Sequence, residues 1–244
     1  MTVDHLDPIG PPDRSYEAQH NMNPIPLQYG LYYHIYNRGN NRENIFIEER
    51  NYRYFLQLYL KYIEPIAWTF AYCLLRNHFH FLVRIKDLTQ KPVRWATASE
   101  LPPDHDSPPD RFLDKGHMSG LVELPNPSRQ FSHFFNAYTR TINQMYHRTG
   151  ALFQRPFGRI PVTTDAYFAR LIVYIHQNPQ KHGFVEDFRD WPYSSYHALL
   201  SDKPTHLQRD RVLRWFNGPQ SVAALHSPEI RDAEILALVP EDFD

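Results

Sequence analysis

The sequence has a single cysteine among its 244 residues, so the chain cannot form an internal disulfide. Cys73 stands in the apolar run WTFAYCLLR, which fits a reducing compartment and predicts a cytoplasmic protein. No apolar run approaches the roughly 18 residues that a membrane span needs, and the N-terminus lacks a basic start followed by an apolar stretch. We therefore expect a soluble protein with no membrane association.

The sequence also lacks a net charge of either sign, with a formal balance of -1, which argues against a general coat protein for nucleic acid. The average conceals local bias. Residues 126–181 hold seven Lys or Arg residues against Asp165 alone, a balance of +6 that favours contact with phosphates. The last 27 residues have a balance of -5, which is typical of a solvated tail or a peripheral helix.

The composition, 42% hydrophobic over 244 residues, predicts one main domain with appendages. Residues 1–28 hold five prolines and little periodicity, so we interpret them as an irregular arm. The domain is expected over residues 29–200, interrupted at 87–129 by an insertion with seven prolines and no apolar period. Residues 201–244 are expected to form an acidic C-terminal extension.

The first half of the domain alternates between β and helical patterns. The stretch GLYYHIYNRG (30–39) predicts a strand that runs into a turn, and residues 40–64 contain a helix with apolar residues at helical spacing. Two strands follow, IAWTFAYCLL (66–75) and HFHFLVRI (78–85). Their short connection favours an antiparallel pair.

The second half adds a helix over 131–150 with Gly150 as its stop, then an edge strand within 151–162, because Pro156 interrupts it. The last helix, 163–179, should begin at Thr164 or Asp165 and end at Pro179. This order predicts an α+β, ferredoxin-like fold: a split βαβ antiparallel sheet with helices on one face, plus an extra closing helix.

Two histidines stand two residues apart in the strand HFHFLVRI. Successive side chains of a strand point to opposite faces, so His78 and His80 share one face and Phe79 and Phe81 the other. Two neutral imidazoles on one face can hold a divalent ion. Two polar-face histidines without a metal are the competing interpretation, which the pair alone leaves open.

The closing helix offers a third ligand and a nucleophile. Tyr174 and Asn178 lie one turn apart, about 40° around the axis, and Tyr167 lies nearly in line with Tyr174. Asn178 can complete a metal site with the two histidines, and Tyr174 would then stand beside that metal. A core tyrosine and a helix-capping asparagine remain the alternative.

The segments NRGNNRENIF, YCLLRNHFHFLV, GALFQRPF, YIHQNPQKHGFV and WPYSSY resemble those of the REP-associated branch of the single-tyrosine transposases, in the HUH superfamily of nucleases. The resemblance covers about residues 29 to 200 outside the insertion. It implies a ferredoxin-like domain that cuts single-stranded DNA near an imperfect, REP-like hairpin. The protein is then expected to act as a monomer or homodimer.

Carried onto this chain, the resemblance makes His78 and His80 the metal ligands and Tyr174 the nucleophile, which forms a 5′-phosphotyrosine. Asn178 takes the place of a glutamine that many relatives have four residues after the tyrosine. Two imidazoles and an amide leave positions open for phosphate and water, which fits Mg²⁺ or Mn²⁺.

DNA recognition is expected from the turn after the first strand and from the basic window, where the glycine lets the backbone approach a strand and the other residues donate to phosphates and bases. The predicted DNA-binding residues are Asn37, Arg38, Gly39, Asn40, Arg42, Arg155 and Arg159. The segment WPYSSY is expected instead to pack the C-terminal part of the chain onto the domain.

Two other functions compete with transposition. One is a domesticated descendant that holds a DNA or RNA hairpin without cutting it. The other is a metal-dependent hydrolase that uses water, with Tyr174 in a structural role. A covalent protein–DNA adduct separates the three.

Overall fold

The computed structural model describes residues 25–87 and 125–226. Residues 1–24, 88–124 and 227–244 lie outside the described residues, and they include nearly all of the predicted arm and insertion and the last 18 residues of the predicted acidic extension. In chain order the elements are β1 (Tyr32–Arg38), η1 (Asn40–Arg42), α2 (Glu49–Tyr62), β2 (Ala67–Leu74), β3 (His78–Ile85), α3 (Pro127–Met145), β4 (Gly158–Pro161), α4 (Asp165–Lys181), η3 (Phe188–Asp190), α5 (Tyr196–Leu200), α6 (Arg209–Trp215) and α7 (Pro219–Leu225).

The strands form one four-stranded sheet with the order β2-β3-β1-β4, in which every pair of neighbours is antiparallel. Two βαβ crossovers, β1-α2-β2 and β3-α3-β4, interlock to give this order, so the predicted α+β, split βαβ fold is confirmed. The predicted edge strand is confirmed as β4. It begins only at Gly158, after Pro156.

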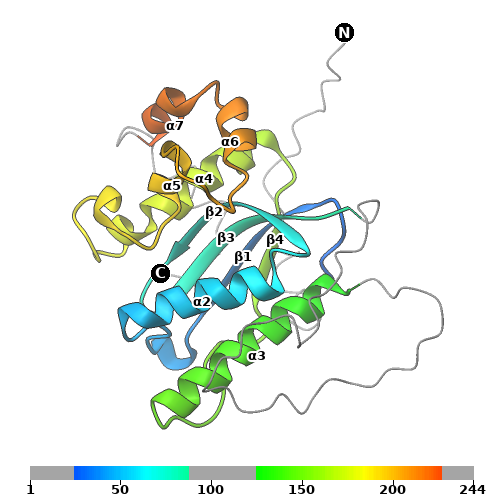
Figure 1. The fold of residues 1–244 in the computed structure, drawn as a ribbon, viewed down its shortest axis with the longest axis vertical. Coiled ribbons are helices and arrows are strands. Elements are labelled where there is room, and N and C mark those ends of the chain that lie inside the picture. The colour runs from blue at the N-terminus through cyan, green and yellow to red at the C-terminus, as the bar shows by residue number, and fades with distance from the viewer. Residues whose placement is uncertain (1–24, 88–124, 227–244) are drawn as a thin grey trace, which may run out of the picture.

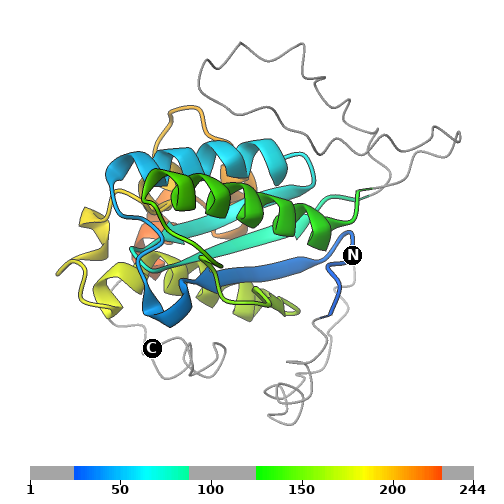
Figure 2. The same cartoon turned by 90° about the horizontal axis from the view of Figure 1, so that it is seen from below.

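Both faces of the sheet are covered. Helices α2 and α3 lie side by side on one face, and α4 lies on the other, with α5, α6 and α7 beyond it (Figures 1 and 2). The expectation of helices on one face therefore holds for the two crossover helices, while the extra helix takes the opposite face. Consequently β3, an inner strand, is buried on both sides.

The core between the sheet and the crossover helices is largely aromatic. Phe55 of α2 is fully buried at its centre. Its ring lies 5.2 Å from that of Phe79 on β3 and 4.7 Å from that of Phe134 on α3, centroid to centroid. Three elements thus meet on one side chain, as the helical spacing of the apolar residues in α2 predicts.

Three predicted helix boundaries were wrong. Helix α3 begins at Pro127 rather than 131, because the Asn126 side chain caps it by accepting from the Arg129 N–H, and proline suits a first helical position. It ends at Met145, well before Gly150. Helix α4 is capped by Thr164, as predicted, but runs through Pro179 to Lys181. Proline removes one helical hydrogen bond only, and the His182 N–H still donates to the Asn178 carbonyl.

A second core lies between the sheet and α4, and residues beyond α4 pack on it. Val212 of α6 and Val222 of α7 are fully buried in it, although both fall in the segment expected to form an extension. The Trp191 indole N–H donates to the Leu74 carbonyl at 2.9 Å, so the predicted packing role of WPYSSY is confirmed.

The single cysteine lies deep in this second core. Cys73 on β2 stands opposite His80 in the strand register and is fully buried, and burial raises the pKa of its thiol well above the ordinary value. None of the described helices is long and apolar enough to cross a membrane.

We expect Phe55→Ala to lower the free energy of unfolding by about 3–5 kcal/mol, because it removes a ring on which three elements converge. Leu31→Ala, at an exposed leucine just before β1, should change it by less than about 0.5 kcal/mol. Urea unfolding followed by circular dichroism measures both. Equal effects of the two substitutions would contradict this account of the core.

Candidate active site

The two histidines of β3 point toward α4. His78 and His80 are each 1% exposed, while Phe79 between them packs into the opposite core. The register sets them directly across from residues of β1, with Arg38 opposite His78 and Tyr36 opposite His80. The predicted alternation of faces in this strand is therefore confirmed.

Helix α4 brings the other two predicted site residues to this face. The Asn178 Oδ1 lies 3.3 Å from the His78 Nε2, and the Tyr174 ring lies 5.5 Å from the His80 ring, centroid to centroid. Both α4 residues are buried, with Tyr174 4% exposed. Residues separated by about a hundred positions in the sequence thus meet in one cluster: His78, His80, Tyr174 and Asn178.

The orientation of His78 makes it a candidate metal ligand. Its Nδ1 lies 2.7 Å from the Asn77 Oδ1, the shorter of its two contacts, so this nitrogen carries the proton of the neutral ring. The Asn178 amide nitrogen donates to the Tyr174 carbonyl at 3.4 Å, which turns Oδ1 toward His78. Two lone pairs, on Nε2 and Oδ1, then face each other, an arrangement that a cation stabilises.

A third histidine, His34 of β1, was missed in the sequence. Its Nε2 lies 2.9 Å from the His80 Nδ1 and the ring is fully buried. When His80 donates from Nδ1 to His34, its other nitrogen, Nε2, carries the lone pair, and the hydrogen bond at Nδ1 fixes the orientation of the ring. The signal was present, because His34, Tyr36 and Arg38 alternate along one face of their strand.

The electrostatics of the cluster keep the imidazoles neutral. Burial, and after it the charge of the neighbouring His182, lower the pKa of His78 to about 3. Burial, and after it the charge of His34, lower the pKa of His80 well below its ordinary value. Neutral rings are the form that binds metals. Among the described residues no three His, Cys, Asp or Glu side chains are grouped to hold an ion, so an amide would have to supply the third donor.

Two cations stand beside the cluster. Arg38 is 6% exposed and its charge lowers the pKa of both β3 histidines. The Lys181 ammonium lies 5.2 Å from the centre of the Tyr174 ring. Lys181 was not among the predicted site residues, although it follows Tyr174 and Asn178 on the same stripe of α4 at i+7. These cations can attract a phosphate to the tyrosine.

The other predicted DNA-binding residues do not join Arg38. Asn37 points to the opposite face of the sheet, where it lines a cavity together with Arg155 and Arg159. Asn40 and Arg42 lie in the turn after β1, where the Asn40 amide donates to the Ala151 carbonyl at 2.9 Å. At Gly39, a Cβ would lie 2.1 Å from the Glu43 carbonyl oxygen, so the chain itself requires this glycine.

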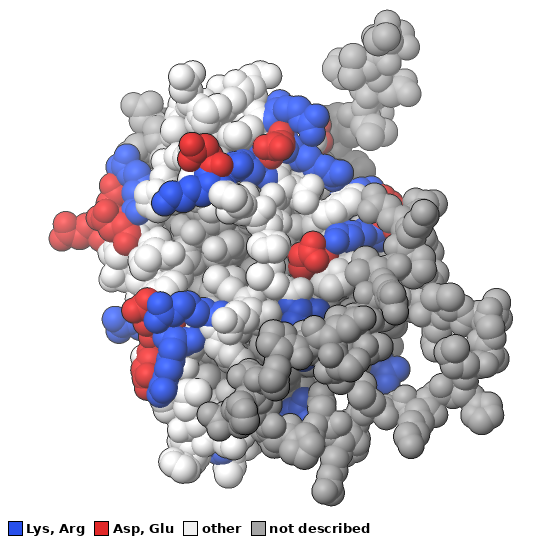
Figure 3. Space-filling view, viewed as in Figure 1, with Lys and Arg blue, Asp and Glu red and all other residues white. Residues whose placement is uncertain are grey.

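On the face shown in Figure 3, the described residues form no broad patch of positive charge. In the view of Figure 3, lysine and arginine side chains lie among aspartates and glutamates rather than in a patch of one sign. Part of the basic window is also neutralised, since Arg148 forms an ion pair with Glu43.

A chain of buried hydrogen bonds holds the back of α4. The Tyr72 N–H donates to the Ser195 Oγ at 2.8 Å, and Ser195 contacts the His176 Nε2 at 2.7 Å. The His176 Nδ1 contacts the His226 Nε2 at 2.7 Å, and the His226 Nδ1 lies 2.7 Å from the Val222 carbonyl.

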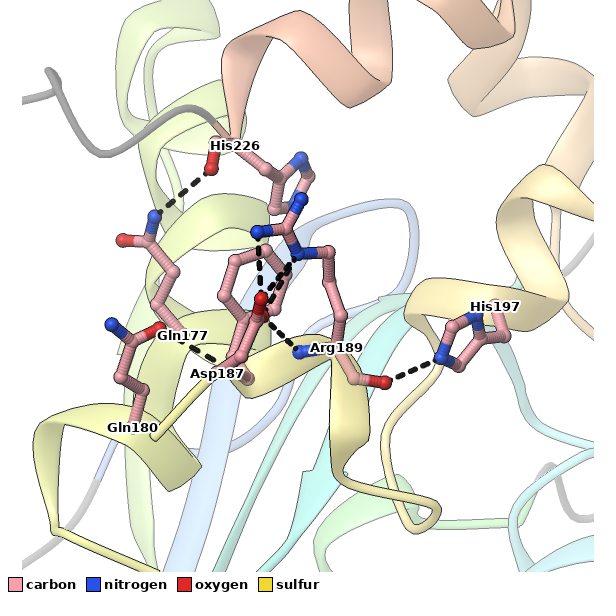
Figure 4. A network of polar contacts seen from close by, with 7 residues as sticks. Gln177, Gln180, Asp187, Arg189, His197 and His226 are labelled. Atoms are coloured by element: carbon pink, nitrogen blue, oxygen red, sulfur yellow. Dashed lines mark hydrogen bonds and ion pairs between the residues drawn. The ribbon is translucent and has the colours of Figure 1, made fainter. Parts of the chain in front are cut away.

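The two ends fix the direction of every donor in this chain, because a backbone N–H only donates and a carbonyl only accepts. The chain links β2, α4 and α7. Figure 4 shows further contacts at the same place, including Gln177 of α4 donating to the His226 carbonyl. His176 lies between Tyr174 and Asn178 in sequence and on the other side of the helix, so this network fixes the rotation of α4 about its axis.

Comparisons with known proteins point to one family name. A Haemophilus influenzae protein, whose name gives it provisionally as a REP-associated tyrosine transposase, is 31% identical over 129 residues, covering 53% of this chain and 58% of that protein. The Escherichia coli protein named REP-associated tyrosine transposase is 29% identical over 83 residues, covering 33% and 48%. The chain spans about half the length of these curated relatives. No family model matches it.

A solved structure of a REP-associated tyrosine transposase bound to a REP hairpin has a TM-score of 0.47 to this chain and 14% identity, covering 75% of this chain and 87% of the other. By sequence, the chain is a homologue of proteins named REP-associated tyrosine transposase.

Acid should destabilise the network behind α4. Burial lowers the pKa of His226 to about 4 from 6.5, so the unfolded chain takes up a proton first as the pH falls. The contribution of His226 to stability is complete above about pH 6.5 and is lost progressively toward pH 4, by up to about 3 kcal/mol. Urea unfolding between pH 7.5 and 4.5 measures this loss.

His226→Gln removes the titrating group, so the unfolding free energy of this variant should fall less steeply with acid. His133→Gln, at an exposed histidine of α3, should retain the full slope. A slope in His226→Gln that equals that of the unmodified protein would show that His226 is not held neutral.

Proposed function

We propose that this protein is a metal-dependent single-stranded DNA endonuclease and strand transferase that acts near DNA hairpins through a 5′-phosphotyrosine. The observation that carries the proposal is the cluster of His78, His80, Tyr174 and Asn178, in which the Tyr174 ring lies 5.5 Å from that of His80. The name shared by the curated relatives supports the same reaction class. Hairpin recognition is supported by the name of the solved structure alone.

In this proposal Tyr174 attacks the phosphorus of one phosphodiester. A bond forms between its hydroxyl oxygen and phosphorus while the bond to the 3′-oxygen breaks. The phenol proton passes to water and the leaving 3′-oxygen takes up a proton. Because the phosphotyrosine keeps the ester energy, a second 3′-hydroxyl can displace Tyr174 and join a new strand.

The chain's own residues position and neutralise the phosphate. Arg38 and Lys181 offset the negative charge of the phosphate as it approaches the tyrosine. A phenol ordinarily has a pKa near 10, so it needs a phosphate with reduced negative charge in order to attack at neutral pH. His78, His80 and Asn178 would hold Mg²⁺ or Mn²⁺, which would supply Lewis-acid polarisation of a non-bridging oxygen. Asn77 and His34 orient the two imidazoles through their Nδ1 atoms.

Tyr174→Phe should lower formation of both the cut strand and the covalent adduct by about 1,000-fold or more, because it removes only the attacking oxygen. Tyr167→Phe, seven residues earlier on the same helix and about 10 Å away along its axis, should retain both products. The assay is a denaturing gel after incubation with hairpin DNA from the flanks of the gene, with mass spectrometry of the adduct peptide.

The same gel separates the alternatives. Cutting without an adduct, unchanged in Tyr174→Phe, would indicate a hydrolase that uses water. Binding of the hairpin with neither product would indicate a domesticated binding protein. An adduct on another tyrosine, such as Tyr138 or Tyr146, would contradict the assignment of the nucleophile.

His80→Ala should abolish cleavage in Mg²⁺ or Mn²⁺ and leave hairpin affinity within about threefold, because the imidazole serves the ion while phosphates are bound mainly by cations. His133→Ala removes an exposed imidazole of α3 and should leave cleavage unchanged. Thermal unfolding verifies that both variants are folded. Full cleavage by His80→Ala would exclude a metal site at these histidines.

A further inference from the structure

A cavity of about 260 Å³ lies on the face of the sheet opposite the histidine cluster. Its walls come from the end of β1, from α3, and from residues 151–157 and Arg159. Asn37 lines it, and Asn37 stands opposite Phe79, whose ring belongs to the core under α2 and α3. The cavity is therefore distinct from the proposed active site.

The cavity is lined by a cation, Arg159, that has no acidic partner among the described residues. The Arg159 guanidinium lies 3.7 Å from the centre of the Phe157 ring, and its Nη1 donates to the Ser128 Oγ at 3.1 Å. Its Nε is buried without a hydrogen-bond partner among the described residues, and burial lowers its pKa to about 10. None of the described residues that line the cavity is acidic. A buried charge in this state gains from binding an anion.

A second cation stands at the opening. Arg155 is exposed, and its Nη2 donates a long hydrogen bond of 3.3 Å to the Asn136 Oδ1. With Arg159 it brings two positive charges to one small cavity. Both guanidinium groups have the planar, forked geometry that phosphate oxygens match.

The remaining walls fit an aromatic heterocycle. The rings of Phe135 and Phe157 pack edge to face, 5.3 Å apart from centroid to centroid, and give the cavity an apolar wall against which a base can pack. The side-chain amides of Asn37 and Asn136 offer donors and acceptors to a base edge. The volume lies just below the roughly 300 Å³ at which small-molecule sites typically begin, so it suits one nucleotide rather than a longer segment.

We propose that this cavity binds one unpaired nucleotide of the DNA substrate, with its base against the phenylalanine rings and its phosphate on Arg155 and Arg159. That the ligand is single-stranded DNA rests on the proposed function. That the ligand combines an anionic group with an aromatic ring is inferred from the cavity alone. Asn37 and Arg38 are consecutive and point to opposite faces, so the cavity and the histidine cluster lie on the two sides of the same end of β1. The site would thus set which phosphodiester reaches Tyr174.

The test uses the full chain as Tyr174→Phe, without divalent metal, so that binding is measured apart from cleavage. The probe is a fluorescent hairpin with single-stranded extensions from the gene's flanks, in which each extension nucleotide is replaced in turn by an abasic site. We expect one abasic position to weaken binding about tenfold, the effect of losing one stacked base. Asn136→Ala, at an exposed position of α3, should remove this sensitivity without disturbing the core.

Arg159→Gln should remove the same sensitivity and make the log-log dependence of affinity on salt shallower by about 0.7. Arg140→Gln takes one exposed charge from the same helix as Asn136 but lies outside the cavity, so it should keep the abasic profile. An abasic profile that is identical in all variants, or an oligonucleotide that does not bind, would overturn the proposal.

Competition by inorganic phosphate at constant ionic strength provides a further arm. If phosphate displaces the oligonucleotide as well as a mononucleotide does, the cavity is an anion site only and the proposed base contact is wrong. Loss of the covalent adduct in other assays would overturn the chemistry at Tyr174 but not this binding result, because the two are measured on different variants.

Discussion

The structure depends on one constraint: β3 is an inner strand that is buried on both faces, so its two-residue alternation must satisfy two different environments. Phe79 and Phe81 fill an aromatic core, while His78 and His80 face a helix. A shift of one residue in register would exchange rings and imidazoles and destroy both faces. The same packing that stabilises the fold therefore fixes the imidazoles, without any contribution from a mobile loop.

The helix on the second face needs to be fixed in rotation as well as in position. A rotation of α4 by one residue, about 100°, would carry Tyr174 and Asn178 away from β3. The hydrogen bonds of His176 to Ser195 and His226 lie on the back of this helix, where the polarity of every donor is set by backbone groups. Ser195 and His226, which follow α4 in the chain, thus fix the orientation of Tyr174 and Asn178 toward β3.

The sequence was sufficient for features that repeat locally and insufficient for those created by distant contacts. Alternation placed His78 and His80 on one face, and helical spacing put Tyr174 and Asn178 on one stripe. Sequence analysis did not identify His34. Its alternation with Tyr36 and Arg38 marks one face of β1, but only the pairing of β1 with β3 places that face beside His80. Pro179 predicts a helix end, because the sequence shows that proline removes one helical hydrogen bond. It does not show the packing of α4 that compensates for this loss and lets the helix continue to Lys181.

Neighbouring residues of one motif were also separated in a way that only pairing reveals. Asn37 and Arg38 look alike as polar donors at the end of a strand, but the pleat sends one to the cavity under α3 and the other to the histidines. The basic window was likewise a property of the sequence rather than of one surface. Arg148 forms an ion pair with Glu43, Arg155 and Arg159 line the cavity, and Lys181 lies beside Tyr174 on α4.

The position of Cys73 gives the protein an internal reporter. It is the single thiol of the chain, lies opposite His80 in the sheet and is fully closed to solvent. Its side chain lies in the core between the sheet and α4, so alkylating reagents reach it only when this core opens, and the rate of labelling reports the opening of α4 from the sheet. The breathing of this region can therefore be followed chemically in the unmodified chain, with no probe introduced.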